Sequence, residues 1–399
     1  MKSVLFYDDA PEFGGHQVMT VLAAESLAER EDVSVGFVFY KENVQLAQRL
    51  NAIKSPSRKI QLYPVGFGSG RLQLLRTLAS PGKISNVAAL IGKLNPDVVV
   101  VSQGRIEASS LGLMAAKRAG AYTISYIPMA HPVAMVGSFF LAGVRDSLNS
   151  RFYRLPDKII TISESSRRML LARGAKPEVV VVPNAVERPC MSPRDREDFR
   201  GTHHIEKDTY VVAILGRIQF KQKGQDFALQ AVESFRNRLG KFQFLIVGSG
   251  PDEEKLRNMI AMLSLEQQVQ VLPWKEDLRA VYAGIDMLLI PSRFEGVPLV
   301  MLEAMSAGVP IVASNVDGMA ELLPHEWLFP YGDCEALIDR LGYVAAADNT
   351  EILESHKNRV AQEFTMAMFR KKFVDAVLGE DRFARGGLNS EPIDFRIPQ

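Results

Sequence analysis

The chain has 399 residues, of which 47% are hydrophobic and 23% are charged, so it contains enough apolar side chains for large cores. At roughly 150 residues per domain, this length predicts two or three domains. The composition excludes a disordered, collagenous or coiled-coil protein. The two cysteines, Cys190 and Cys334, are too few for a disulfide framework, so we expect a reducing, cytoplasmic compartment.

The formal net charge of +1 conceals an asymmetry between the two halves of the chain. Residues 1–185 contain 22 Lys and Arg against 14 Asp and Glu, whereas the remainder contains 25 against 32. No acidic residue stands within residues 43–96, where the basic residues are Arg49, Lys54, Arg58, Lys59, Arg71, Arg76, Lys83 and Lys93. This stretch is either a solvated face that acids elsewhere balance or a surface for an anionic partner.

Short apolar runs alternate with amphipathic segments along the whole chain. The runs that predict buried strands are Val4–Tyr7, Val33–Phe39, Val98–Val101, Thr123–Ile127, Ile159–Ile162, Val179–Val182, Tyr210–Leu215, Phe242–Val247, Val269–Leu272, Met287–Ile290 and Ile311–Ala313. Uninterrupted runs rich in Val and Ile are typical of parallel strands that are covered on both faces. The segments between them, such as Gln17–Arg30 and Ala108–Arg118, predict helices. The alternation therefore predicts an α/β fold of two Rossmann-like domains whose parallel sheets face a central cleft.

The best domain boundary is the charged, proline-containing segment 183–209. We expect one Rossmann-like domain over residues 1–185 and a second Rossmann-like domain over 205–361. A helix at about 362–378 would pack back on the first domain, and residues 380–399 read as a flexible tail. Because ligands of open parallel sheets bind beyond the carboxyl ends of the strands, the loops that follow strands hold the candidate sites.

The strongest local signal is the segment 291–314, in which a predicted strand ends at Pro291 and a helix begins near Pro298. Glu295 lies just before the helix N-terminus, where free backbone N–H groups favour an anion. A helix cap is the simpler explanation of Glu295. It does not account for Glu303, which lies more than one turn into the helix, nor for Gly296.

The second signal is the segment 216–226, which also follows a predicted strand. Arg217 and Lys223 flank a tight loop that Gly224 closes, and two cations at the carboxyl end of a strand suit a pyrophosphate. Lys221 competes with them for this role. The glycine-rich turn 247–251 follows the next strand. We expect it to have a structural role in the wall of the cleft.

These segments together resemble the family 4 retaining glycosyltransferases, which have the GT-B fold. Glu295 and Glu303 stand in the E-x7-E motif of that family, which the run EAM-x-x-G-x-P-x-V-x-S follows. Arg217 and Lys223 stand in a G-R-(x5)-K-G loop of a spacing that occurs among its members. The resemblance covers most of residues 155–340 and, more loosely, the N-terminal domain. It implies that a sugar moves from a UDP- or GDP-linked donor to an acceptor hydroxyl with retention of configuration.

The resemblance also implies that residues 1–185 form an acceptor-binding domain and residues 205–361 a nucleotide-sugar-binding domain, and it implies a role for each matching residue. Glu295 would hold hydroxyls of the donor sugar, Glu303 would accept hydrogen bonds from the ribose, and Arg217 and Lys223 would bind the diphosphate. The remaining donor-binding residues belong to the helix tip, to a loop beside the base and to the glycine-rich turn, and they are Gly296, Val297, Pro298, Leu299, Val300, Trp274, Lys275 and Gly248.

Two features of the first half complete the candidate site. Gly14 and Gly15 follow the first predicted strand, where glycines let backbone N–H groups approach a phosphate or an acceptor. His131 follows the fifth predicted strand, at a place where the family often has a histidine near the donor sugar. A lone histidine beside prolines is also explained by a structural role.

The implied catalytic set is therefore Glu295, Arg217, Lys223 and His131. No cofactor and no metal are expected, because the two cations and the helix tip would neutralise the leaving diphosphate. The expected partners are a nucleotide-sugar donor, a glycan or lipid-linked acceptor and, through residues 43–96, an anionic membrane surface on the inner face of the membrane, but no nucleic acid. Two alternatives stay open: a nucleotide-sugar epimerase or other GT-B enzyme, and a non-catalytic subunit that binds sugar nucleotides.

Overall fold

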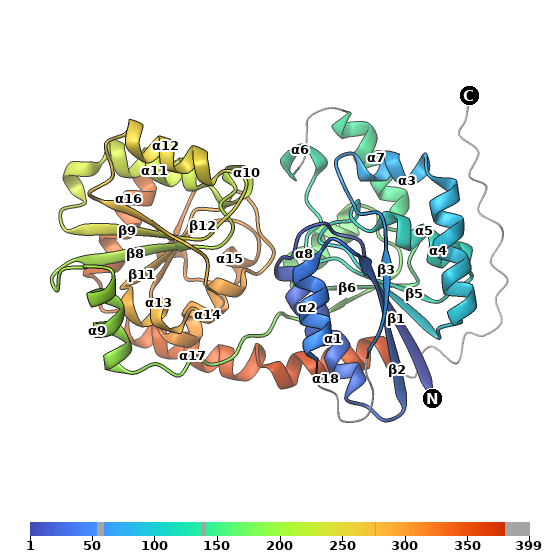
Figure 1. Ribbon diagram of the computed structural model, residues 1–399. Helices are drawn as coiled ribbons and strands as arrows, with labels where there is room; N and C mark the ends of the chain where they lie inside the picture. The colour runs from blue at the N-terminus through green and yellow to red at the C-terminus, as the bar shows by residue number, and fades with distance from the viewer. Residues whose placement is uncertain (54–59, 137–140, 276, 380–399) are drawn as a thin grey trace.

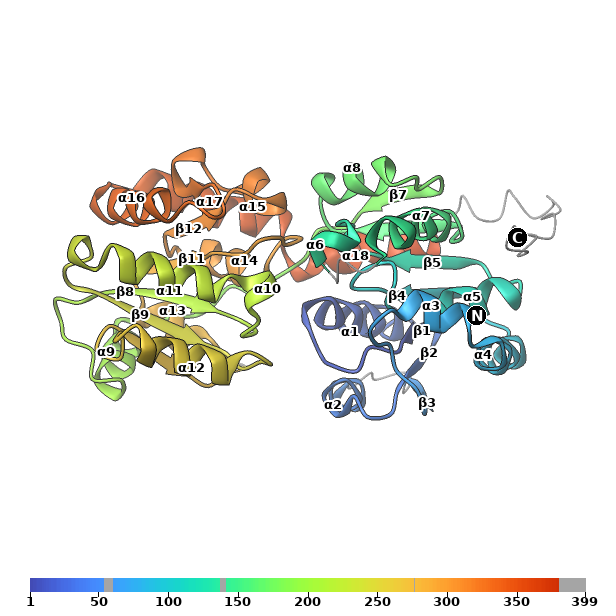
Figure 2. The same cartoon turned by 90° about the horizontal axis from the view of Figure 1, so that it is seen from above.

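A computed structural model of the protein describes residues 1–53, 60–136, 141–275 and 277–379. It contains two α/β domains side by side, each built on a central sheet with helices on both faces (Figures 1 and 2). Every pair of neighbouring strands is parallel, which confirms the predicted fold class. The predicted tail, residues 380–399, lies outside the described residues.

The sheet of the N-terminal domain has the strand order β3-β2-β1-β4-β5-β6-β7. Its strands are β1 (Lys2–Asp8), β2 (Val33–Tyr40), β3 (Gln61–Val65), β4 (Val98–Ser102), β5 (Thr123–Tyr126), β6 (Lys158–Thr161) and β7 (Glu178–Val181). The sheet of the C-terminal domain has the order β10-β9-β8-β11-β12-β13. Its strands are β8 (Tyr210–Leu215), β9 (Phe242–Val247), β10 (Val269–Leu272), β11 (Met287–Ile290), β12 (Ile311–Ser314) and β13 (Leu328–Phe329).

Helices follow most strands and cover the faces of both sheets (Figure 1). In the N-terminal domain they are α1 (Gly15–Ala28), α2 (Val44–Ala52), α3 (Gln73–Leu78), α4 (Pro81–Leu94), α5 (Ser110–Arg118), α6 (Val133–Val136), α7 (Ala142–Phe152) and α8 (Glu164–Ala172). Those that follow are α9 (Pro193–Thr202), α10 (Phe220–Lys223), α11 (Gln225–Ser234), α12 (Glu253–Met262), α13 (Arg279–Gly284), α14 (Leu299–Ala307), α15 (Asp317–Leu322), α16 (Cys334–Ala346), α17 (Thr350–Glu363) and α18 (Met366–Leu378), with 3-10 turns at Arg236–Arg238 and His325–Trp327.

Strand β1 shows why the apolar runs form central strands. Successive side chains of a strand point to opposite faces of the sheet. Val4 and Phe6 accordingly join the hydrophobic cluster on one face, while Leu5 and Tyr7 join the cluster on the other. All four are at most 2% exposed. A strand that is buried on both faces needs apolar residues at every position, and this is the pattern seen in the sequence.

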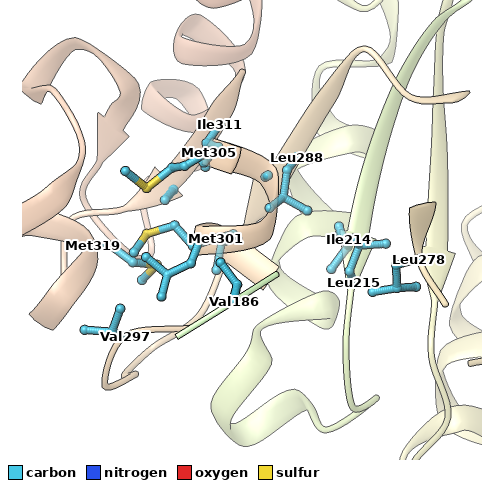
Figure 3. Close-up of a cluster of buried hydrophobic side chains, with 14 of the residues drawn as sticks. Val186, Ile214, Leu215, Leu278, Leu288, Val297, Met301, Met305, Ile311 and Met319 are labelled. Carbon is cyan, nitrogen blue, oxygen red and sulfur yellow. The ribbon is translucent and has the colours of Figure 1, made fainter. Parts of the chain in front are cut away.

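Helix α14 is fixed in the C-terminal domain by its apolar side chains. Met301 and Met305 are fully buried and point into the same cluster as Leu288 of β11 and Ile311 of β12 (Figure 3). Glu303 is the charged residue of this helix. Packing on the sheet therefore holds the N-terminus of α14, and the loop before it, at the carboxyl ends of β11 and β12.

The chain returns to the N-terminal domain through α18, which lies beside α1 (Figure 1). The Phe373 ring lies 6.5 Å from the Phe6 ring and 6.1 Å from the Tyr126 ring, measured between centroids. Arg370 also pairs with Glu25 at 3.1 Å and with Glu29. Two chain segments, residues 182–192 and the α17–α18 pair, therefore connect the domains.

Several elements were not expected from the sequence. Strand β3 contains Pro64 and lies at the edge of its sheet, where a missing N–H is tolerated, and β13 has two residues. Helix α9 lies within the expected domain connection, and a capping box of Ser192 and Asp195 begins it. Pro298, near which a helix was expected to begin, is the N-cap of α14.

The described part of the stretch 43–96 forms α2, β3, α3 and α4. Arg49, Arg71, Arg76, Lys83 and Lys93 are solvent-exposed, whereas Lys54, Arg58 and Lys59 lie outside the described residues. Several apolar residues of the stretch are buried or half-buried, and these are Leu62, Tyr63, Val65, Phe67, Leu72, Leu74 and Leu75, whereas Val44 and Leu78 are exposed. Within the described ranges, no helix is long and apolar enough to cross a membrane.

Candidate functional site

Four loops of the C-terminal domain meet beyond the carboxyl ends of parallel strands. They follow β8, β9, β11 and β12, which are neighbours in the sheet. The loop after β11 carries Glu295, and the loop after β8 carries Arg217 and Lys223. The sheet thus brings two of the predicted motifs to one edge, although Lys223 and Glu295 are 72 positions apart in the sequence.

The carboxylate of Glu295 contacts three side chains at this edge, and the residue is 5% exposed. Lys223 Nζ donates to Glu295 Oε1 at 2.5 Å, and the Ser292 hydroxyl donates to the same oxygen at 2.9 Å. Gln222 Nε2 reaches Glu295 Oε2 at 3.5 Å. Lys223 lies in the last turn of α10, which Gly224 ends at φ +66° in the left-handed region. A side chain at Gly224 would meet the carbonyl oxygen of Pro291 at 2.0 Å, so the two loops need a glycine there.

Asp317 joins Glu295 to the N-terminal domain. Its Oδ2 accepts the backbone N–H of Glu295 at 2.8 Å and lies 2.9 Å from Nε2 of His131. His131 is 8% exposed, its ring lies 5.3 Å from the Phe294 ring, and its Nδ1 has no partner among the described residues. His131 therefore lies at a buried contact between the two domains, where it pairs with Asp317, a carboxylate that the sequence analysis did not single out.

Glycines allow close contact between the domains beside Glu295. A Cβ at Gly296 would lie 2.6 Å from Ile162 Cδ1 and 3.1 Å from the Pro128 oxygen, both in the N-terminal domain. A Cβ at Gly318 would lie 2.4 Å from the Gly296 oxygen, which the Gly318 N–H contacts at 3.1 Å. Asn184 Nδ2 donates to the next carbonyl, that of Val297, at 2.8 Å. The helix tip of α14 is consequently packed against the other domain and shielded from water.

Arg217 points away from Glu295 toward the N-terminal glycine loop. Its Nη1 pairs with Glu12 Oε2 at 2.7 Å and its Nη2 donates to the Phe13 carbonyl at 3.1 Å. A Cβ at Gly14 would lie 3.4 Å from Arg217 Nη2, and one at Gly15 would lie 4.0 Å from Leu299 Cδ1. A cleft of 530 Å³ opens here between the two domains. Arg217 and Lys223 are thus paired with different carboxylates instead of facing one point together.

Glu303 occupies a separate place on α14, where it is half-buried. The Tyr282 hydroxyl donates to Glu303 Oε2 at 2.8 Å and also reaches the Val300 carbonyl at 3.1 Å. Burial raises the pKa of Glu303, while the Tyr282 hydrogen bond lowers it by a smaller amount. The remaining lone pairs of this carboxylate can accept hydrogen bonds from a ligand hydroxyl.

The remaining donor-binding residues lie on either side of these groups. Val297 and Pro298 are buried, while Leu299 and Val300 are half-buried at the start of α14. A Cβ at Gly248 would meet the Gly216 carbonyl oxygen at 1.9 Å, so this glycine lets two loops pack backbone against backbone. Trp274 is 43% exposed and Lys275 is exposed beyond β10, at the edge of the sheet.

The carboxyl end of β1 adds buried acids to the N-terminal side of the cleft. Asp8 is fully buried, and its Oδ2 lies 3.6 Å from His16 Nε2. Asp9 accepts hydrogen bonds from Tyr7 at 2.9 Å, from Ser109 at 3.2 Å and from Ser69. Burial is the largest cause that raises the pKa of Asp9 to about 6, and these hydrogen bonds oppose it. Within the described ranges, no group of three or more His, Cys, Asp or Glu could hold a metal ion.

The fold and this cleft define a two-domain protein of the GT-B type. The family model "Glycosyl transferase 4-like domain" matches residues 14–185, and "Glycosyl transferases group 1" matches residues 209–346. Together the two models match most of the chain, which therefore belongs to the family 4 glycosyltransferases.

Curated relatives agree with this assignment. The putative colanic acid biosynthesis glycosyltransferase WcaL of Escherichia coli K12 is 28% identical over 166 residues, or 38% of this chain and 41% of the relative. An Escherichia coli UDP-Gal:α-D-GlcNAc-diphosphoundecaprenol α-1,3-galactosyltransferase is 26% identical over 209 residues, or 50% and 53% of the two chains. This chain spans about half the length of the first curated relatives it matches.

The crystal structure of Anabaena HepE in complex with UDP and glucose has the same fold. Its TM-score is 0.76 at 17% sequence identity, and the match covers 95% of this chain and 100% of HepE.

Proposed function

We propose that the chain transfers a sugar from a nucleotide diphosphate sugar to a hydroxyl of a lipid-linked or glycan acceptor. In this proposal the anomeric configuration is retained and no metal ion is required. The observation that carries the proposal is the Lys223–Glu295 pair, which stands beyond a strand end and beside the tip of α14. HepE, which binds UDP and glucose, supports a UDP-linked donor, and the galactosyltransferase named for diphosphoundecaprenol supports a lipid-linked acceptor.

The donor would replace protein partners with its own groups. The diphosphate takes Lys223 from Glu295 and Arg217 from Glu12, and backbone N–H groups at the tip of α14 add a favourable dipole. Glu295, freed from the lysine, accepts hydrogen bonds from the donor sugar. Glu303, which keeps Tyr282, accepts those of the ribose.

In the reaction the bond between the anomeric carbon and the diphosphate oxygen breaks, and both electrons stay on the diphosphate. The acceptor oxygen bonds to the same face of that carbon, and its proton passes to the departing phosphate. Lys223 and Arg217 stabilise the growing negative charge, an effect that is worth several kcal/mol when donors are preorganised. The close packing at Gly296 keeps water away from the reacting carbon.

The test is release of nucleoside diphosphate from UDP- and GDP-sugars, with and without added glycan or lipid-linked acceptors. We expect release that depends on the acceptor, persists in EDTA, and falls by orders of magnitude in Glu295→Gln. The matched control is Glu326→Gln, an acid at a 3-10 turn away from the cleft, which should leave the rate unchanged. A new sugar nucleotide formed without acceptor indicates an epimerase, and no turnover with any donor indicates a non-catalytic subunit.

Contact with an anionic membrane through residues 43–96 and a cytoplasmic position on the inner face of the membrane stay predictions. Basic residues near a membrane contribute about 1 kcal/mol each to binding. Flotation with liposomes that contain or lack anionic lipid tests the contact, and no binding to either kind contradicts it.

A further inference from the structure

Three basic residues that the donor site does not use lie on elements of the two domains that face each other. Arg293 follows β11, and its N–H donates to the Gln222 carbonyl at 2.8 Å, so it lies beside the turn of Lys221 in α10. Arg105 follows β4 of the other domain, and its Nη1 donates to the Val136 carbonyl of α6 at 3.2 Å. All three side chains are exposed. We call Arg105, Lys221 and Arg293 the cleft cation cluster.

The cleft cation cluster lacks compensating acids. Glu107 forms a bidentate pair with the buried Arg145, whose Nε and Nη2 donate to its carboxylate oxygens at 3.0 Å and 2.5 Å. Among the described residues, no carboxylate forms an ion pair with Arg105, Lys221 or Arg293. Arg293 is instead held by Tyr331, whose hydroxyl accepts from its Nε at 2.5 Å.

Electrostatics indicate that these charges act on one another. The pKa of Lys221 is lowered, first by desolvation and then by the charges of Arg105, Arg293 and Arg145. Desolvation and Arg145 lower the pKa of Arg105, against the opposite effect of Glu107. These side chains are exposed and yet partly desolvated, as is expected for cations in a cleft. An oxyanion placed between them would relieve the repulsion between their charges.

The cluster is distinct from the donor cations. Lys221 and Lys223 are two positions apart on α10, and side chains at that spacing do not share a helix face. Lys223 pairs with Glu295 and Arg217 with Glu12, whereas the contacts of Arg105 run to α6.

Exposed apolar side chains lie next to the cluster. Helix α6 packs against α7, and the exposed residues of this pair include Met135 at 39%, Leu141 at 46% and Val144 at 54%. Arg105 donates to Val136, the last residue of α6 and the neighbour of Met135, and α6 lies on the side of the N-terminal domain that faces α10 (Figures 1 and 2). A polar group next to an exposed apolar surface matches a ligand with an anionic head and an apolar tail.

We propose that the cleft cation cluster binds a phosphate group of a lipid-linked acceptor, and that Met135, Leu141 and Val144 contact its lipid chain. This inference rests on the proposed glycosyl transfer and names the site that orients the acceptor. Two guanidinium groups and an ammonium group provide the forked and point-like donors that suit a diphosphate. The cluster combines residues of both domains, so a bound acceptor would also favour their closed arrangement.

The test uses farnesyl diphosphate and inorganic pyrophosphate as probes, each titrated calorimetrically in the presence of saturating UDP. We expect farnesyl diphosphate to bind alongside UDP, and Arg105→Ala or Lys221→Ala to weaken it about tenfold or more. Leu141→Ser should weaken farnesyl diphosphate but not pyrophosphate. The matched control is Arg238→Ala, an exposed arginine paired with Asp339 outside the cleft, which should leave both affinities unchanged.

Three results would overturn the inference: no probe binding with UDP present, displacement of UDP by the probe, or an unchanged affinity in Arg105→Ala. Equal affinities for the two probes would overturn the lipid contact. A titration with UDP alone distinguishes a failure of this inference from a failure of the proposed glycosyl transfer. A chain that binds farnesyl diphosphate in an Arg105-dependent way but never binds UDP would refute the donor site and support the phosphate site.

Discussion

The ion pair of Lys223 and Glu295 allows the donor site to be tested without knowing the sugar. We consider the variants Lys223→Met and Glu295→Gln, and the double variant. The two side chains are 21% and 7% exposed, so the pair lies between the surface and the interior. Exposed pairs contribute about 0.2–1 kcal/mol, and breaking buried pairs costs about 3–5 kcal/mol. We therefore expect a coupling free energy of about 2 kcal/mol for the ligand-free chain.

Saturating UDP should reduce this coupling below about 1 kcal/mol, because Lys223 then binds the diphosphate in place of Glu295. The assay is urea unfolding followed by tryptophan fluorescence. Both tryptophans, Trp274 and Trp327, lie in the C-terminal domain, so the signal reports the domain that contains the pair.

The exposed pair of Arg257 and Glu253 on α12 is the control, with an expected coupling of at most about 0.5 kcal/mol and no response to UDP. A Lys223–Glu295 coupling that is the same with and without UDP would refute the reasoning, because the diphosphate would then not reach Lys223.

Three further predictions concern the glycine loop, the domain contact and pH. Glu12→Gln should raise the affinity for UDP about two- to fivefold in calorimetry by freeing Arg217 from an exposed pair, and a weaker affinity would contradict this role. Gly296→Ala should lower acceptor-dependent turnover at least about tenfold, because its Cβ would press on the other domain, whereas Gly92→Ala, with open space around it, should not. Burial lowers the pKa of His356 to about 4, so stability that is complete above about pH 6.5 should fall by up to about 3 kcal/mol as pH drops toward 4. The variant His356→Phe should lose this acid-side slope in urea unfolding, and an unchanged slope would contradict it.

Much of the fold follows from the sequence because buried parallel strands need apolar residues at every position. The predicted runs Tyr210–Leu215, Phe242–Val247, Val269–Leu272 and Met287–Ile290 have the bounds of β8, β9, β10 and β11. Strand β3 lacks this signal, since an edge strand with one partly exposed face can alternate and can contain Pro64.

The candidate site was harder to predict where it depends on both domains. Motif and spacing place Glu295 and Lys223 at strand ends, and the sheet order then brings them together. Asp317 could have been found as an acid that opens a helix directly after a strand, but its contact with His131 depends on how two separate domains meet. The same holds for Arg217 and Glu12, because local patterns carry no information about the facing loop of another domain.

The most direct test of the account is a crystal structure of the chain with a bound UDP-sugar. We expect the diphosphate within about 3 Å of Lys223 Nζ, the ribose at Glu303 and the sugar at Glu295. A nucleotide bound away from the loops that follow β8 and β11, with the Lys223–Glu295 pair intact, would contradict the account.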